Sequence, residues 1–284
     1  MQSVLVGLLG KNILASKSPL LHESEAQALG LSLIYRLYDF TVSHASTDDL
    51  EQYLQAAELL DFSGFNITHP FKQAIIPFLD ELSEEARTIN AVNTVIFRNN
   101  KRSGFNTDYL GFRDAFQVEL ASAATDKVVL LGAGGAGCAV GAAMLNLGTR
   151  HLFIHDKNMS RAHELTNSLN QRYGAGKVSA IAETGPVLAK ADGLINASPI
   201  GMAEFPGMPL KPDQLRPELW VADIIYFPIE TQLLRHARLT GCRTMNGGRM
   251  AVYQAASAFE LFTGLKADRE RMLQTFNATV ANNI

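Results

Sequence analysis

Short apolar runs alternate with amphipathic segments along the first hundred residues of the chain. The apolar runs have the length of buried strands and the amphipathic segments have a helical period, so an α/β arrangement is expected. Ser18 precedes Pro19, which predicts a helix with Ser18 as its N-cap and Pro19 as its first residue. The expected strands span residues 3–9, 33–38, 64–68, 91–97 and 102–107, the last two forming a hairpin around Asn99-Asn100-Lys101, and the expected helices span residues 19–30 and 48–60.

From about residue 127 onward, short strands alternate regularly with helices, which is typical of βα units around a mostly parallel sheet. A domain boundary is expected within residues 108–126. The chain is expected to return to the first domain near Asn246-Gly247-Gly248, where the two glycines suit a hinge. The expected strands are 127–131, 151–156, 177–181, 193–197 and 220–225, and the expected helices extend from the glycine cluster to about residue 147 and over 160–173, 229–241, 250–263 and 268–282.

Composition excludes several classes of protein. A length of 284 residues suggests about two domains. The chain has 25 basic and 28 acidic residues, a net charge of −3, so it lacks the basic excess of a nucleic-acid-binding protein. Residues 128–149 carry no charge and are apolar enough for a membrane span, but the glycines clustered at 132–137 indicate a strand, a turn and a buried helix instead. No membrane partner is therefore expected.

The cysteine and histidine spacings do not favour a metal site. Cys138 and Cys242 are far apart and form no C-x-x-C motif. No basic segment precedes the apolar run at the N-terminus, so we expect no signal peptide, a reducing cytoplasmic location and two buried thiols. His151 and His155 are four residues apart, but they fall on a predicted strand with no third ligand nearby, so no metal is expected.

A glycine-rich segment matches the dinucleotide-binding pattern G-x-G-x-x-G in the right context, after a strand and before a helix. Its glycines would allow a tight turn, close approach of a pyrophosphate and packing of helix on strand, and the helix N-terminus would attract phosphates. The alternative is a turn needed only for packing. We call this segment the glycine turn; its residues are Gly132, Ala133, Gly134, Gly135, Ala136 and Gly137.

Asp156 lies nineteen residues after Gly137, at the end of the next predicted strand. A carboxylate there would accept a hydrogen bond from a ribose 2′-hydroxyl and repel a 2′-phosphate. NAD is therefore the predicted cofactor. NADP is kept as a weaker alternative, because the following Lys157 could attract a phosphate. The other interpretation is a solvated Asp at a strand end.

Polar residues follow several strands of the first half of the chain. Ser16 and Ser18 could bind a carboxylate together with helix amides, unless Ser18 only caps the helix. Lys72 and Asp108 could serve in the oxidation of a secondary alcohol, with Lys transferring the proton, Asp orienting it and a nicotinamide taking the hydride. Further hydroxyl and amide groups suited to a small polyhydroxylated acid are on Asn66, Thr68, Asn90, Asn93, Thr94, Asn106 and Thr107.

Seven motifs, in order along nearly the whole chain, resemble those of the shikimate/quinate dehydrogenase family. Besides the glycine turn they are Ser16-x-Ser18-Pro19-x-x-His22, Asn66-x-Thr68-x-Pro70-x-Lys72, Ala91-Val92-Asn93-Thr94 with Asn106-Thr107-Asp108-x-x-Gly111, Asn196-Ala197-Ser198-Pro199-Ile200-Gly201-Met202, Asp223-x-x-Tyr226-x-Pro228 and Gly247-x-x-Met250-x-x-x-Gln254. The resemblance implies a Rossmann-type, doubly wound parallel-sheet domain that binds NAD, over 111–247. It also implies a smaller α/β substrate domain formed by both termini, over 1–110 and 248–284.

The same resemblance implies roles for individual residues. Lys72 and Asp108 would be the catalytic pair. The substrate-binding residues would be Ser16 and Ser18 for a carboxylate, Thr68, Asn93 and Gln254 for ring hydroxyls, and Tyr226 close by; Ile224 and Gly247 would line the nicotinamide pocket. Biosynthetic NADP-dependent members carry Asn-Arg-Thr where this chain has Asp156-Lys157-Asn158, with Arg161 beyond. At these positions the chain resembles the NAD-dependent quinate/shikimate branch of the family.

The expected activity is the interconversion of shikimate and 3-dehydroshikimate with NAD. Quinate oxidation, or activity on both acids, is the alternative, although Ser18 gives no clear reason to favour the extra C1 hydroxyl of quinate. A catalytically silent regulator would require loss of Lys72 or Asp108, and both are present. A methyltransferase would also use a glycine turn and a ribose-binding acid, but that activity would not explain the polar residues that follow the strands in the first half of the chain. The expected partner is a small-molecule substrate, bound by a monomer or homodimer.

Overall fold

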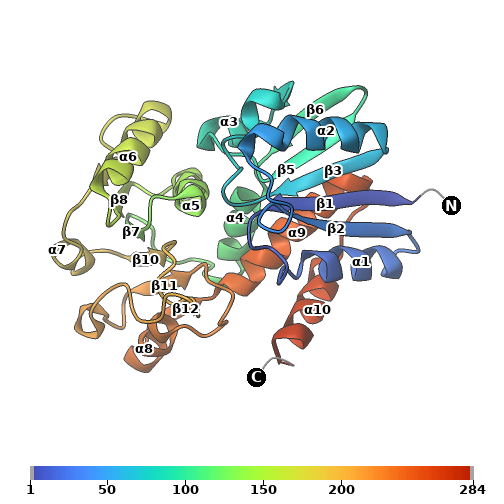
Figure 1. Ribbon diagram of the computed structural model, residues 1–284. Coiled ribbons are helices and arrows are strands. Elements are labelled where there is room, and N and C mark those ends of the chain that lie inside the picture. The colour runs from blue at the N-terminus through green and yellow to red at the C-terminus, as the bar shows by residue number, and fades with distance from the viewer. Residues whose placement is uncertain (1–2, 282–284) are drawn as a thin grey trace. The chain divides into compact units, whose positions relative to one another are not determined.

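The computed structural model describes the backbone of residues 3–281 and the side chains of residues 3–279. The chain forms two compact units (Figure 1). One is Met1–Thr107 with Val252–Ile284, of which residues 1–2 and 282–284 lie outside the described part, and the other is Asp108–Ala251. The sequence prediction placed the two boundaries between the units at 110/111 and 247/248, a few residues from the boundaries in the structure.

The first unit contains a mixed six-stranded sheet in the order β2-β1-β3-β5-β6-β4. Strand β1 is parallel to β2 and β3, whereas β5 is antiparallel to both β3 and β6. Asn99 and Asn100 both have positive φ, 54° and 56°, as a type I′ turn requires, so the predicted hairpin is confirmed. The strands are β1 (Val4–Gly10), β2 (Leu33–Asp39), β3 (Phe62–Ile67), β4 (Glu81–Leu82), β5 (Thr94–Arg98) and β6 (Lys101–Phe105).

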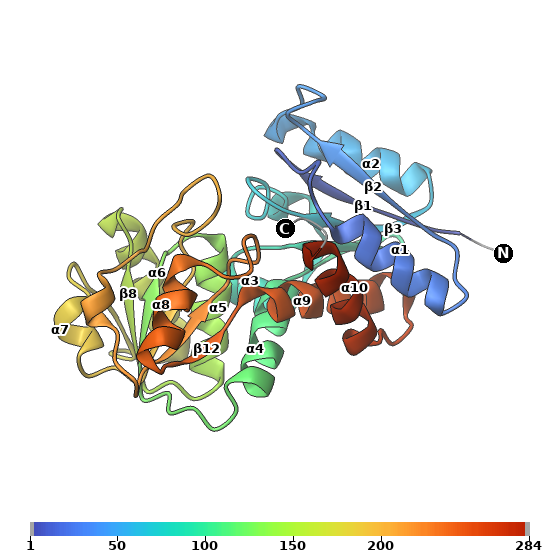
Figure 2. The same cartoon turned by 90° about the horizontal axis from the view of Figure 1, so that it is seen from below.

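Helices cover both faces of this sheet: α2 lies on one face and α1 with α10 on the other (Figure 2). The core under α2 contains Leu54, Phe65 and Phe71, all almost fully buried. Buried Glu25 of α1 accepts hydrogen bonds from Arg271 of α10 at 2.6 and 2.8 Å and from the Asp268 amide at 2.7 Å. The helices are α1 (Ser18–Ala28), α2 (Leu50–Leu59), α3 (Glu84–Ile89) and α10 (Arg269–Ala281), with 3₁₀ turns at Thr47–Asp49 and Ile76–Phe78.

The second unit contains a six-stranded sheet that is parallel throughout, in the order β12-β11-β10-β7-β8-β9. This is the doubly wound Rossmann order, as predicted. The order reverses between β7 and β10, and ligands of such sheets bind at the carboxyl ends of the strands flanking this point. The strands are β7 (Lys127–Leu131), β8 (His151–His155), β9 (Val178–Ala180), β10 (Gly193–Asn196), β11 (Trp220–Asp223) and β12 (Arg243–Met245).

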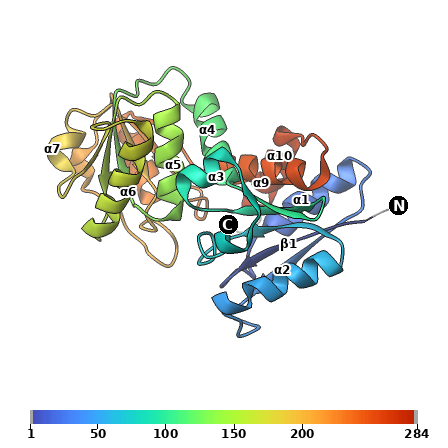
Figure 3. The same ribbon diagram turned by 90° about the horizontal axis from the view of Figure 1, so that it is seen from above.

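Successive side chains of β7 point to opposite faces of this sheet and pack against the helices on each face. Val129 and Leu131 lie in one apolar cluster with Leu188 of α7 and Leu233 of α8. On the other face α5 and α6 lie side by side (Figure 3), where Gly141 leaves just enough room for neighbouring leucines. The helices of this unit are α5 (Gly135–Asn146), α6 (Met159–Tyr173), α7 (Gly185–Leu188) and α8 (Gln232–Thr240), with a 3₁₀ turn at Pro212–Gln214.

Two helices extend into segments for which no helix was expected. Helix α4 (Thr107–Glu119) covers most of the segment 108–126, where the domain boundary was expected, because Phe112, Ala115 and Phe116 form a buried apolar face. Helix α9 (Gly247–Thr263) begins at the glycines expected in a hinge loop. The predicted end of the last helix, Asn282, lies outside the described residues.

The prediction that Ser18 caps helix α1 is wrong. The helix begins at Ser18 itself, Lys17 occupies the N-cap, and the side chain of Lys17 makes no capping hydrogen bond. The hydroxyl of Ser16 instead accepts a hydrogen bond from the Ser18 amide at 3.3 Å. One amide of the first turn is thus satisfied by the preceding serine, so Ser18 is not needed as a cap.

The cysteine prediction needs one correction, because both thiols are free but only Cys242 is buried and Cys138 is partly exposed. Among the described residues, no helix is long and apolar enough to cross a membrane. Within the same part of the chain, no group of three or more His, Cys, Asp or Glu side chains is placed to hold a metal ion.

Candidate active site

In the first unit, polar side chains from four segments form one buried hydrogen-bond network. Asn93, which precedes β5, donates to Thr107 Oγ1 at 2.9 Å, and its Oδ1 accepts from the Thr107 amide at 2.7 Å. Thr107 Oγ1 lies 3.4 Å from Gln254 Oε1 of helix α9. Asn66, at the end of β3, donates to Thr94 Oγ1 at 3.0 Å. The structure therefore brings Asn93 and Gln254 together from segments far apart in the sequence.

The two candidate carboxylate-binding serines are adjacent. Ser16 lies in the loop after β1, and its hydroxyl donates to Ser18 Oγ at 3.2 Å. Tyr35 of β2 joins the network of Asn66, because its phenol donates to Asn66 Oδ1 at 2.8 Å.

Thr68 directly follows β3 and Lys72 lies in the turns after it, before a short 3₁₀ turn at Ile76–Phe78. The Lys72 carbonyl accepts from the Val92 amide at 2.8 Å, which fixes the backbone of Lys72 beside the segment leading to Asn93. The Thr68 amide donates to the Leu9 carbonyl at 2.9 Å, at the end of β1. Thr68 and Lys72 are therefore held at the same end of the sheet as Asn66.

Asp108 lies in the first turn of α4, directly after Thr107. It is the first residue of the second unit, whereas Lys72 belongs to the first. The pairing of Lys72 with Asp108 stays a prediction.

In the second unit, the glycine turn connects β7 to α5. Gly132 has φ +100°, and a Cβ there would lie 2.7 Å from the Ala197 carbonyl carbon and oxygen. A Cβ on Gly137 would lie 2.0 Å from the Gly132 oxygen, so the first and last glycines are required by packing. Around Gly134 and Gly135, nothing lies within 4 Å of the Cβ position. This open space at the N-terminus of α5 fits a pyrophosphate approaching the backbone.

Asp156 directly follows β8 and is fixed beside the glycine turn. Its carboxylate accepts from the Ala133 amide and from the Asn158 amide, each at 2.8 Å. A carboxylate can accept about four hydrogen bonds, so two amides leave acceptor capacity for ribose hydroxyls. Arg161, in the first turn of α6, is exposed.

A second buried network, to which the sequence assigned no role, supports the other candidate cofactor residues. Asp223 accepts from Asn196 at 3.1 Å, from the Ile225 amide at 3.1 Å and from the Thr231 hydroxyl at 2.7 Å. Burial raises the pKa of the Asp223 carboxyl to about 6, although these three hydrogen bonds act to lower it. The network thereby fixes the loop after β11, which carries Ile224.

Gly247 packs against the backbone of this loop, and Tyr226 lies just after Ile224 in the chain. A Cβ on Gly247 would lie 2.2 Å from the Ile224 carbonyl oxygen, so glycine is needed for this close approach of two backbones. Tyr226 is half exposed, which leaves its side chain accessible.

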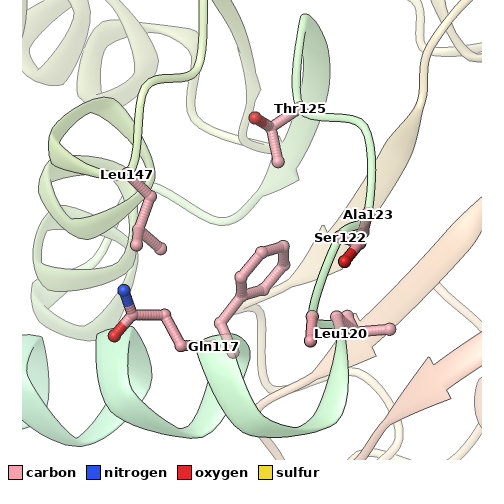
Figure 4. Close-up of a pocket in the computed structure, with 8 residues that line it drawn as sticks. Gln117, Leu120, Ser122, Ala123, Thr125 and Leu147 are labelled. Atoms are coloured by element: carbon pink, nitrogen blue, oxygen red, sulfur yellow. The ribbon is translucent and has the colours of Figure 1, made fainter.

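The second unit also contains a pocket of about 310 Å³ that none of these residues lines. It is lined by the end of α4, the segment after it and the end of α5 (Figure 4). Its eight lining residues are Phe116, Gln117, Leu120, Ala121, Ser122, Ala123, Thr125 and Leu147. None of them was predicted to bind a ligand, and none carries a charge.

Comparisons with known proteins agree with the sequence motifs. A family model described as the shikimate dehydrogenase substrate binding domain matches residues 8–95, and one described as the shikimate 5′-dehydrogenase C-terminal domain matches residues 248–275. A quinate/shikimate dehydrogenase (NAD(+)) from Corynebacterium efficiens is 44% identical, over 96% of this chain and 98% of its own. A shikimate dehydrogenase (NADP(+)) from Streptomyces avermitilis is 47% identical, over 95% and 94%.

A solved structure gives the same result. The structure of quinate dehydrogenase from Corynebacterium glutamicum in complex with NAD superimposes with a TM-score of 0.94 and 43% identity. The match covers 97% of this chain and 99% of that one.

Proposed function

Because this chain belongs to the shikimate/quinate dehydrogenase family, we propose that it is an NAD-dependent enzyme that interconverts shikimate and 3-dehydroshikimate. The observation that supports this most strongly is the continuous polar network of the first unit, which ends in hydroxyl and amide groups at one end of the sheet. A small acid with several ring hydroxyls needs such a set of fixed donors and acceptors.

NAD is the proposed cofactor because the carboxylate of Asp156 is fixed next to the glycine turn. A ribose 2′-hydroxyl can donate to this carboxylate, whereas a 2′-phosphate would be repelled. The bound nicotinamide would accept the hydride of the alcohol. Gly134 and Gly135 would accommodate the pyrophosphate, and Ile224 and Gly247 would line the nicotinamide pocket.

Lys72 and Asp108 are the proposed catalytic residues. During oxidation, the C–H bond of the secondary alcohol breaks as the hydride leaves, and the O–H proton passes to Lys72 Nζ. Asp108 would orient Lys72 and bind a ring hydroxyl. Reduction of the ketone reverses both transfers, with Lys72 donating the proton.

The substrate carboxylate is proposed to bind the hydroxyls of Ser16 and Ser18. Because Ser18 is not the N-cap of α1, its hydroxyl is not committed to the helix. Thr68, Asn93 and Gln254 would bind ring hydroxyls, with Tyr226 close by. Quinate is the alternative substrate, since relatives named for quinate and for shikimate both match most of the chain.

Steady-state rates with shikimate and quinate, each with NAD and NADP, test the proposal. We expect the highest kcat/KM with shikimate and NAD. A higher kcat/KM with quinate would replace the proposed substrate with the alternative. Absence of turnover in all four combinations would refute the proposed activity.

A further inference from the structure

Asn196 is the last residue of β10, and it pairs in register with Asp223, the last residue of β11. Its side chain is fully buried. Both strands end at the side of the sheet where ligands of this fold bind. The loops after β10 and β11 therefore both start from this pair of residues.

All four hydrogen-bonding positions of the Asn196 side chain are used. Its Nδ2 donates to the Ile200 carbonyl at 3.0 Å and to Asp223 Oδ1 at 3.1 Å. Its Oδ1 accepts from the Ser198 amide at 3.1 Å and from the Ser198 hydroxyl at 2.7 Å. A carbonyl only accepts and an amide N–H only donates, so these partners fix which side of the Asn196 amide carries the nitrogen.

These bonds hold the loop after β10. The Ser198 hydroxyl oxygen also accepts from the Ile200 amide at 3.3 Å, so residues 198–200 turn around the Asn196 side chain. Gly201 follows with φ +116°, and a Cβ there would lie 3.2 Å from Ile225 Cδ1. The loop after β10 thus packs directly against the loop after β11.

Asn196 also holds the loop after β11. Its carbonyl accepts from the Ile224 amide at 3.1 Å. Asp223 Oδ1, which accepts from Asn196 Nδ2, also accepts from the Ile225 amide at 3.1 Å. The Ile225 carbonyl accepts in turn from the Gly247 amide at 3.2 Å. Ile224 and Gly247, the proposed lining of the nicotinamide pocket, are therefore placed by hydrogen bonds that lead back to Asn196.

The glycine turn does not depend on this side chain. Ala197, which packs on Gly132, is fixed by its own backbone, because its amide donates to the Leu131 carbonyl at 2.7 Å. Asp156 accepts its hydrogen bonds from two amides outside both loops. A substitution of Asn196 should therefore affect the nicotinamide end of the cofactor and spare the end held by the glycine turn and Asp156.

We propose that Asn196 is a positioning residue for the nicotinamide of NAD: its side chain holds the loops after β10 and β11 together and so keeps Ile224 and Gly247 in place. This inference rests on the proposed binding of NAD. Because the Asn196 side chain is fully buried, it acts through the two loops and not by touching the cofactor.

Asn196→Asp tests this role, because it keeps the shape of the side chain but replaces both N–H donors by a carboxylate oxygen. That oxygen would face the Ile200 carbonyl and the Asp223 carboxylate. Two carboxylates this close share one proton at lower pH, and burial already raises the pKa of Asp223 to about 6. The other groups bonded to Asp223, the Thr231 hydroxyl and the Ile225 amide, do not titrate in this range. The shared proton restores one donor, so the defect should be larger at pH 8 than at pH 5.5.

Asn170→Asp is the matched control, since it adds the same charge to the same unit. Asn170 of α6 donates to the Val178 carbonyl at 2.8 Å and accepts from the Val178 amide at 2.9 Å, but at the amino end of β9. Calorimetric titration of the full chain gives Kd for NAD and for ADP-ribose, which lacks the nicotinamide. Values of kcat and kcat/KM for NAD are measured with shikimate, or with quinate if that is the better substrate, at both pH values. Circular dichroism and the thermal midpoint report on folding.

We expect Asn196→Asp to lower kcat/KM for NAD roughly 10-fold or more at pH 8, because it breaks a buried hydrogen bond to a charged group. Kd for ADP-ribose should stay close to that of the parent protein. At pH 5.5 the loss relative to the parent should be roughly 3-fold smaller or less, because the pair of carboxyl groups then holds a proton. Asn170→Asp should match the parent in all these constants, even if its thermal midpoint falls.

Three results would overturn the inference: a kcat/KM like that of the parent in folded Asn196→Asp, equal losses for NAD and ADP-ribose, or a loss that does not shrink at pH 5.5. If Asn196→Asp does not fold, Ser198→Ala tests the same loops without burying a charge. It removes the 2.7 Å bond to Asn196 and should lower kcat/KM for NAD roughly 3- to 10-fold with ADP-ribose binding unchanged; a kcat/KM like that of the parent would overturn the inference. A parent protein that binds no NAD, or that converts neither acid, would instead refute the proposed function.

Discussion

Replacing Asp223 by Asn should change how the stability of the second unit depends on pH. Asp223 is 1% exposed, and burial raises its pKa from 3.8 to about 6. Between these two values the folded state binds more protons than the unfolded state, so the free energy of unfolding rises as the pH falls. The ionised carboxylate therefore costs stability at neutral pH, in contrast to a carboxylate whose pKa is lowered by folding.

The size of the effect follows from the two pKa values. At pH 7.5 the folded protein gains almost nothing from protonating Asp223. At pH 5 the linkage relation gives a gain of about 1 to 2 kcal/mol, and well below pH 3.8 it approaches about 3 kcal/mol. The asparagine side chain of the Asp223→Asn variant can keep the observed geometry, because its oxygen still accepts from Asn196 and Ile225 and its NH₂ group can donate to Thr231.

Urea unfolding at pH 7.5 and pH 5 measures this difference. The only tryptophan of the chain, Trp220, is buried on β11 three residues before Asp223, so its fluorescence reports on unfolding of this unit. We expect the free energy of unfolding of the parent protein, relative to Asp223→Asn, to increase by about 1 to 2 kcal/mol between pH 7.5 and pH 5. Asp213→Asn, at an exposed position, controls for the change in net charge. An unchanged difference, or a decrease, would refute the reasoning.

Three further substitutions test the proposed chemistry. Lys72→Ala should lower kcat by roughly 10²- to 10⁴-fold but leave NAD affinity, measured by fluorescence titration, nearly unchanged; a near-normal kcat would assign proton transfer to another group. Asp156→Asn should narrow the preference for NAD over NADP in kcat/KM, because it removes the charge that repels a 2′-phosphate; a wider preference would contradict the assignment. Ser16→Ala should raise the substrate KM more than it lowers kcat, since the carboxylate contact is similar in the ground and transition states. A lower kcat with an unchanged KM would argue against this role of Ser16.

The sequence predicted the second unit well because its signals are local. Each βα unit combines an apolar strand with an amphipathic helix, and the glycine turn lies where one strand meets one helix. Strand β12, Arg243–Met245, was missed because three residues with one buried side chain give no apolar run. Helix α4 was missed although its apolar residues have a helical period, because the segment was considered only as the place of the domain boundary.

The candidate site was only partly predictable. Lys72, Asp108 and the serines could be named because they stand in motifs. The place of Tyr35 in the network could not be predicted, because an apolar strand pattern accounts for a tyrosine without any polar partner. Its bond to Asn66 depends on the parallel pairing of β1 with β2 and β3. Asp223 and Asn196 belong to motifs, but their pairing arises from the register of β10 with β11.

The buried carboxylate of Glu25 has a consequence for how the chain is synthesised. The second unit is one continuous segment, Asp108–Ala251, which can fold as soon as it leaves the ribosome. The first unit cannot be completed at that stage, because Glu25 takes its hydrogen bonds from Asp268 and Arg271, some 245 residues later. An uncompensated buried charge is costly, so helix α1 should remain loosely docked in the nascent chain until those residues emerge. The N-terminal segment would then remain incompletely packed until the last residues of the chain are made, although it is the first part of the chain to be synthesised.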